Sequence, residues 1–349
     1  MTGEMDVSAL LAAQCDQLFS EMVDAKLLGS VEAGHAPQAL DAAVNDLDLS
    51  FALVSEVSGG AGLAWSDIGG VFEAIGYHVA PVELGESIIA NWAIVACGLE
   101  PTRNVLGLAA EMLSCDVHGS SLGGSCTVGW SGTVDEILVV ARAPDGLFLC
   151  LVDPATGSSV EAPNLARDPR RRFTFTHAEP LKSVKWDLGS HGLEPFVAVL
   201  RSAQIAGALS RMLELSIEYG NTRVQFGRPI GKFQSIQHMI AELAGEAAAS
   251  KAAVQLALRG LDDGRVLEGA GVGKVRTSLA VGKASAIAHA VFGAIGVTEE
   301  HVLHYFTRRA WQWRADAGDE HIWSQRLGEI ALAQTGADFW PRLVALGGD

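Results

Sequence analysis

Apolar residues recur at helical spacing in two long segments of the chain, on either side of a short break. Between 194 and 220, and again between 233 and 261, hydrophobic residues return every three or four positions, which is typical of a helix with one buried stripe. Gly227, Pro229 and Gly231 interrupt the pattern between these segments, and both residue types end regular structure. The pattern therefore predicts two long helices joined by a tight elbow.

The same spacing marks most of the remaining chain, except for a middle part with a different pattern. Further helices are predicted over 9–28, 37–49, 65–79, 82–98 and 266–292, and in a final stretch to 346. Short runs rich in Val, Leu, Phe and Thr at 136–142, 147–152 and 172–176 are separated by turn residues, which favours strands. We therefore expect a mainly α protein with a small inserted antiparallel β domain, divided into 1–110, 111–192 and 193–349.

Composition and charge exclude several classes of function. The chain has 349 residues, of which 49% are hydrophobic and 19% charged, as in a globular protein with a sizeable core. Its net charge of -16 argues against a nucleic-acid partner. The acidic start of the chain indicates no secretory signal, and the lack of a run of 18 apolar residues indicates no membrane span. The five cysteines are scattered, which is typical of reduced thiols. We expect a cytoplasmic protein.

The elbow carries a candidate anion-binding site. Arg223 and Arg228 supply guanidinium groups, Gln225 and Gln234 supply amides, and the second helix begins beside them. A guanidinium offers a fork of donors, and backbone N–H groups at a helix start add positive potential, so together they can hold a phosphodiester. The alternative is that the two arginines only solvate a bend, and spacing alone leaves both interpretations open.

Three segments resemble one family. Residues 222–234 contain the string R-x-Q-F-G-x-P-I-x-x-F-Q, with Tyr219 four positions before the arginine, and this closely resembles the most recognisable stretch of the acyl-CoA dehydrogenases. Residues 58–76 and 290–309 are similar to two further segments of that family. The resemblance implies an N-terminal helical domain, a middle β domain and a C-terminal four-helix bundle. It also implies that FAD is shared at a subunit interface.

The chain departs from the family where the flavin ring would lie. Family members usually carry T-E-P-x-x-G-S-D and W-I-[TS] segments, whereas 114–118 and 127–130 occupy these places here. Trp130 could stack on a ligand or pack in the core. Ala290 stands where a glutamine usually reaches the diphosphate end, and Ala294 replaces a glycine. These changes predict a reduced flavin half-site in this chain.

The position of the catalytic base is apolar in both family arrangements. The family reaction is α,β-dehydrogenation of an acyl-CoA thioester, in which a carboxylate removes the α proton and the flavin accepts the hydride. The resemblance places this base at Ala317 or at Val197. Glu194, Asp319 and Glu320 lie near these positions, but a carboxylate displaced by a helical turn would miss the substrate. We therefore predict no catalytic residue in this chain.

The residues that a subunit usually donates to its neighbour's flavin are intact: Arg223, Gln225, Phe226 and Gln234. The chain thus resembles the shortened, base-less subunit of heterotetrameric bacterial steroid-type acyl-CoA dehydrogenases. The resemblance implies a longer partner subunit with the base glutamate, a bulky acyl-CoA substrate such as a steroid side-chain thioester, and an electron-transfer flavoprotein as acceptor. It also implies that the isolated chain is inactive.

The residues alone are also compatible with two other functions and with one other site. The chain could be a self-sufficient homomeric dehydrogenase with a relocated carboxylate base, or a flavin-free binding or scaffold subunit. Glu299, Glu300, His301 and His304 could suggest a metal site, but no third ligand is placed by spacing. A solvated, charged helix start is the stronger interpretation of this cluster, so no metal is predicted.

Overall fold

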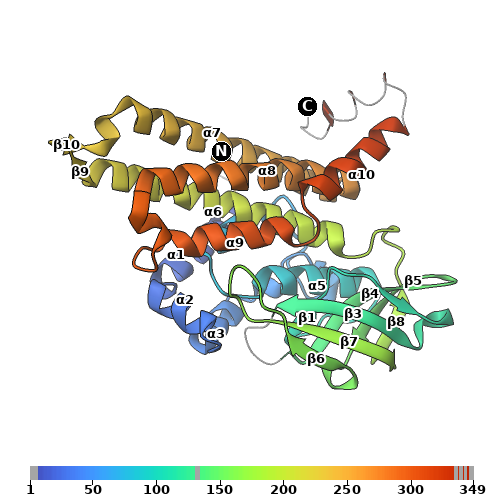
Figure 1. The fold of residues 1–349 in the computed structure, drawn as a ribbon. Coiled ribbons are helices and arrows are strands. Elements are labelled where there is room, and N and C mark those ends of the chain that lie inside the picture. Colours follow the sequence, from blue (N-terminus) through green and yellow to red (C-terminus); the bar gives the residue numbers. More distant parts are fainter. Residues whose placement is uncertain (1–6, 130–133, 334–336, 338–340, 342–343, 346–349) are drawn as a thin grey trace, which may run out of the picture. The chain divides into compact units, whose positions relative to one another are not determined.

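The computed structural model describes residues 7–129, 134–333, 337, 341 and 344–345 (Figure 1). Contacts between its elements divide the chain into two compact units. The helical unit comprises the described residues of 1–25, 65–80 and 198–349, and the sheet unit comprises those of 26–64 and 81–197. The three-domain division expected from the sequence stays a prediction.

The helical unit is built around three long helices that lie side by side (Figure 1). Its helices are α1 (Val7–Met22), α4 (Gly69–His78), α6 (Glu194–Thr222), α7 (Gln234–Asp262), α8 (Val266–Phe292), α9 (Leu303–Ala315) and α10 (Glu320–Leu332). The first residues of α6 belong to the sheet unit. The helices α6, α7 and α8 confirm the three longest segments predicted from apolar spacing. The predicted final stretch is two helices, and beyond 333 only four residues are described.

Two of these helices are unusually apolar. By length and composition alone, α6 and the run from Val266 to Val297 would be able to cross a membrane. In the most apolar window of each, 78% and 50% of the residues are buried inside the protein. Such burial is what the core helices of a helical bundle require.

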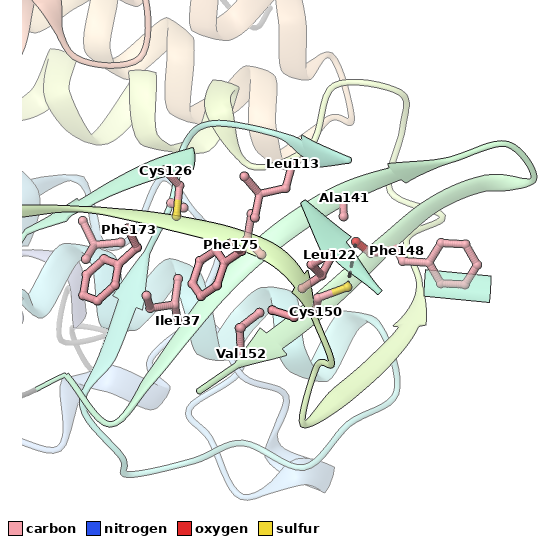
Figure 2. Close-up of a cluster of buried hydrophobic side chains, with 14 of the residues drawn as sticks. Leu113, Leu122, Cys126, Ile137, Ala141, Phe148, Cys150, Val152, Phe173 and Phe175 are labelled. Carbon is pink, nitrogen blue, oxygen red and sulfur yellow. Dashed lines mark hydrogen bonds between the residues drawn. The ribbon is translucent and has the colours of Figure 1, made fainter. Parts of the chain in front are cut away.

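The sheet unit holds α2 (Ala25–Glu32), α3 (Gln38–Asp46), α5 (Leu84–Ala96) and one mixed sheet. The strands are β1 (Leu106–Leu108), β2 (Leu113–Cys115), β3 (Leu122–Gly129), β4 (Glu136–Ala143), β5 (Gly146–Val152), β6 (Ser158–Glu161), β7 (Arg170–Ala178) and β8 (Lys182–Lys185). Their order is β6-β7-β3-β2-β4-β5-β8, with β1 also paired to β4. Phe173, Phe175 and Ile137 are among the side chains that fill its core (Figure 2).

Several sequence expectations need correction. The sheet is mixed rather than purely antiparallel, because β1 and β2 both run parallel to β4. The single helix expected over 9–28 is two helices, since Asp24 lies at a break and aspartate favours helix ends over interiors. The helices expected from 65 and 82 begin later, at Gly69 and Leu84. Trp130 lies outside the described residues.

Candidate cofactor-binding site

The elbow between α6 and α7 is a two-residue hairpin. The strands β9 (Val224–Gln225) and β10 (Arg228–Pro229) pair antiparallel, with Arg228 opposite Gln225. The two turn residues, Phe226 and Gly227, have φ of 51° and 81°. Positive φ at both central residues is the geometry of the tight hairpin turns that match strand twist. The hairpin confirms the predicted elbow and presents Phe226 at its tip.

Backbone contacts hold the base of this hairpin closed. The Ile230 N–H donates to the Arg223 carbonyl oxygen at 2.9 Å, and the Arg223 N–H donates to the Tyr219 carbonyl oxygen at 2.8 Å. A Cβ added at Gly231 would lie 2.9 Å from the Gly220 carbonyl oxygen, so the two chain segments cross without side chains between them. The backbone of Arg223 is therefore fixed at the point where the helix ends.

A pocket of about 660 Å³ opens beside the elbow, within the helical unit. It is bounded by the end of α6, the hairpin, the start of α7, and the segment where α8 ends and η6 (Gly293–Val297) begins. The lining residues are Tyr219, Arg223, Gln225, Phe226, Ile230, Phe233, Ser235, Ile236 and Ala290 to Ile295. Thus the structure brings Arg223, Gln225 and Phe226 together, whereas Gln234 does not line the pocket and instead lies 3.5 Å from His238.

Aromatic rings form much of the pocket wall. The ring of Tyr219 stacks on Phe292 with centroids 4.4 Å apart and planes 27° apart. The ring of Phe226 meets Phe233 edge-on at 6.1 Å, and the guanidinium of Arg228 lies 4.3 Å above the Phe233 ring. Phe226 is nevertheless 91% exposed. The ring of Phe226 is therefore accessible to a ligand or a partner.

The electrostatics of the pocket suit an anion. Arg223 is the one charged side chain among its described lining residues. The adjoining helix α7 begins at Gln234, and Phe233 before it supplies no side-chain cap. A guanidinium beside an uncapped helix start favours phosphate oxygens, and aromatic walls favour a planar ring. The residues present therefore fit the nucleotide end of a dinucleotide, which they can bind but cannot oxidise or reduce.

Neither predicted base position holds a carboxylate. Val197 is buried in the first turn of α6. Ala317 has a φ of 53°, and its carbonyl oxygen accepts a 2.8 Å hydrogen bond from Trp323 Nε1. Neither side chain can accept a proton from a substrate.

The nearby carboxylates are engaged in holding the fold. Asp319 caps α10, accepting from the N–H groups of His321 and Ile322 at 3.0 and 3.1 Å, and these bonds lower its pKa. Glu320 accepts from Arg314 Nε at 2.9 Å, which lowers the pKa of Glu320. A carboxylate with a lowered pKa is a weaker base. Asp319 and Glu320 therefore serve structural roles. The third nearby carboxylate, Glu194, lies half-buried at the start of α6.

The sequence alone does not predict that Phe233, Ser235 and Phe292 line one pocket. The only indication in the sequence is that Phe233 and Phe292 lie within the segments that resemble the acyl-CoA dehydrogenases. Among the residues that the structure describes, no group of three or more His, Cys, Asp or Glu side chains is arranged to hold a metal ion.

The chain is similar to acyl-CoA dehydrogenases along most of its length. Residues 198–330 match the family model described as acyl-CoA dehydrogenase, C-terminal domain. The chain is 28% identical over 261 residues to acyl-CoA dehydrogenase IpdE2 of Mycobacterium tuberculosis, covering 74% of this chain and 75% of that protein. It is 27% identical over 280 residues to IpdE2 of Mycolicibacterium smegmatis, covering 80% and 83%.

Solved structures share the fold. The ChsE4-ChsE5 complex from Mycobacterium tuberculosis matches with a TM-score of 0.84 and 19% identity, over 96% of this chain and 99% of that one. A variant of the Tcur3481-Tcur3483 steroid ACAD matches with a TM-score of 0.83 and 24% identity, over 93% and 98%. PigA with FAD and proline matches with a TM-score of 0.79 and 19% identity, over 96% and 100%. These matches confirm the predicted fold class.

Proposed function

Because the chain belongs to the acyl-CoA dehydrogenase family, we propose that it is one subunit of a heteromeric, FAD-dependent acyl-CoA dehydrogenase. In this assembly it holds the nucleotide end of a flavin whose ring lies in a partner subunit. The observation that carries the proposal is a pocket with one guanidinium and aromatic walls in a chain whose two base positions are apolar.

The pocket residues have distinct roles in this proposal. Arg223 binds the diphosphate, because its guanidinium is the pocket's charged group and its backbone is fixed by the elbow. Phe226 packs against the adenosine, and Gln225 beside it supplies an amide. Gln234, in the first turn of α7, does not line the pocket in the lone chain. In the assembled complex its amide reaches the diphosphate.

The chemistry of the reaction then belongs to the partner. When bound, FAD supplies a hydride acceptor for the α,β-dehydrogenation of an acyl-CoA. Since Ala317 and Val197 cannot accept a proton, a longer acyl-CoA dehydrogenase subunit supplies the base and the ring pocket. This chain contributes binding and orientation of the cofactor, and by itself it is inactive.

The similar proteins support the substrate class and the kind of assembly. Two structural neighbours are named as pairs of different chains, and one of these is named as a steroid ACAD. Another neighbour is named as containing FAD. We therefore propose a bulky, steroid-type acyl-CoA as substrate and an electron-transfer flavoprotein as electron acceptor.

The proposal is tested by purifying the chain alone and together with its partner, and measuring flavin per chain by absorbance. We expect a colourless lone chain and a pair that carries one FAD for every two chains. Arg223→Ala should strip flavin from the pair, whereas Arg172→Ala, which changes an exposed arginine of the sheet unit, should leave it bound. A yellow lone chain that oxidises acyl-CoA would overturn the proposal.

A further inference from the structure

Phe292, in the wall of the pocket, contacts two other rings. Tyr219 stacks on it from α6, with centroids 4.4 Å apart. His301 contacts it at the same centroid distance, with planes 45° apart. Tyr219 and Phe292 line the pocket, whereas His301 does not. His301 is thus placed as a support for this wall rather than as a ligand contact.

His301 is also tied to the start of α9. Its Nδ1 accepts a 3.1 Å hydrogen bond from the N–H of Leu303, the first residue of that helix. Its carbonyl oxygen accepts a 2.7 Å hydrogen bond from Nδ1 of His304. Because Nδ1 of His301 is an acceptor, its proton must sit on Nε2, and the ring must be neutral.

Protonation would break this arrangement for two reasons. A hydrogen on Nδ1 of His301 would face the N–H of Leu303, and the capping bond would be lost. A positive charge would also lie at the N-terminus of α9, where the helix dipole disfavours cations.

The surroundings of His301 also favour the neutral ring. Burial lowers its pKa first and His304 lowers it further, while Glu218 on α6 raises it. Glu299 and Glu300 precede it on its own segment, and α8 contributes the uncharged Phe292. The combined effect keeps the ring neutral at neutral pH and lets acidification charge it.

We propose that His301 is a positioning residue that supports the aromatic wall of the pocket only while it is neutral, so that acidification weakens retention of the bound cofactor. The identity of that cofactor as FAD rests on the proposed function. Protonation releases the first turn of α9 and the contact with Phe292, and the stack of Phe292 on Tyr219 then loses its support.

The test measures flavin retained by the assembled complex between about pH 8 and about pH 5, which spans the ordinary histidine pKa of about 6.5. Between these pH values, flavin affinity of the unchanged protein should fall roughly fivefold more than that of His301→Asn, since losing a helix cap has about this effect. Asparagine places its Oδ1 where Nδ1 of His301 lies, so it offers an acceptor to Leu303 but does not titrate. His321→Asn, at an exposed position on α10, is the matched control and should keep the pH dependence of the unchanged protein.

A second measurement does not require flavin. Hydrogen exchange at the amide of Leu303 in the lone chain should lose protection on acidification, relative to His301→Asn at each pH. Identical pH profiles for the unchanged protein and His301→Asn would overturn the role of His301. Absence of flavin from the complex at about pH 8 would overturn the proposed function, and the exchange experiment would still decide the inference.

Discussion

Lys274 Nζ lies 2.7 Å from the carbonyl oxygen of Asp316 and donates a hydrogen bond to it from a fully buried position. The same amine donates to the carbonyl oxygen of Trp313, so it satisfies two carbonyls at the end of α9. Asp316 also accepts from Gln312 Nε2 at 2.8 Å. The segment in which the family resemblance places a catalytic base, at Ala317, is therefore held by side chains around it.

Burial of Lys274 predicts a specific pH dependence of stability. Burial lowers its pKa from 10.5 to about 7, so between these values the unfolded chain binds more protons than the folded one. Stability should therefore rise with pH from about 7 to about 10. Lys274→Met should lower stability, because it leaves two carbonyls without a donor, and should flatten this rise.

Denaturant unfolding at several pH values checks the Lys274 prediction. Lys232→Met, which removes an exposed amine at the elbow, is the control and should keep the rise. Stability of the unchanged protein that is flat or falls over this range would contradict the prediction, as would an unaltered rise in Lys274→Met.

The crossing at the elbow predicts that Gly231 tolerates no side chain. Its added Cβ would meet the Gly220 carbonyl oxygen at 2.9 Å, and backbone atoms cannot rotate away. Gly231→Ala should therefore cost about 1–3 kcal/mol in the free energy of unfolding. Gly245→Ala is the control, because its Cβ would meet nothing within 4 Å inside α7, and it should stabilise by up to about 1 kcal/mol. Equal stability of the two variants would show that the crossing is not tight.

Replacing Phe226 should weaken cofactor binding without lowering stability. It is 91% exposed in the free chain, so Phe226→Ala should change the free energy of unfolding by less than about 0.5 kcal/mol. In the assembled complex it should weaken FAD roughly tenfold, through lost aromatic packing. Val224→Ala, 59% exposed and outside the pocket lining, is the control. Equal flavin affinity in the two variants would remove Phe226 from the site.

A carboxylate restored at the base position should not restore activity to the lone chain. In Ala317→Glu a base is present, but the segments that shape the flavin ring pocket in the family are absent. Acyl-CoA oxidation measured with an artificial electron acceptor should stay at the level of Ala317→Gln, which matches its size without the charge. Activity specific to the glutamate variant would mean that this chain holds its own flavin ring.

Elements with a local signal could be predicted from the residues alone. The period of apolar residues predicted α6, α7 and α8, because one buried stripe on a helix requires that spacing. Glycine and proline predicted the elbow, since Gly227 takes the positive φ that its turn demands. The motif around Arg223 and the apolar residues at Ala317 and Val197 carried the family resemblance and the expectation of a missing base.

Contacts between residues far apart in the chain could not be predicted in this way and are seen in the folded protein. The parallel pairing of β1 and β2 with β4 depends on crossover connections that no local pattern records. The contacts of Phe292 with Tyr219 and His301 depend on packing the end of α8 against α6 and the segment before α9. Neighbouring positions along the chain specify backbone conformation, whereas a pocket wall is specified by contacts between side chains far apart in sequence. That is why the elbow was predictable and the pocket beside it was not.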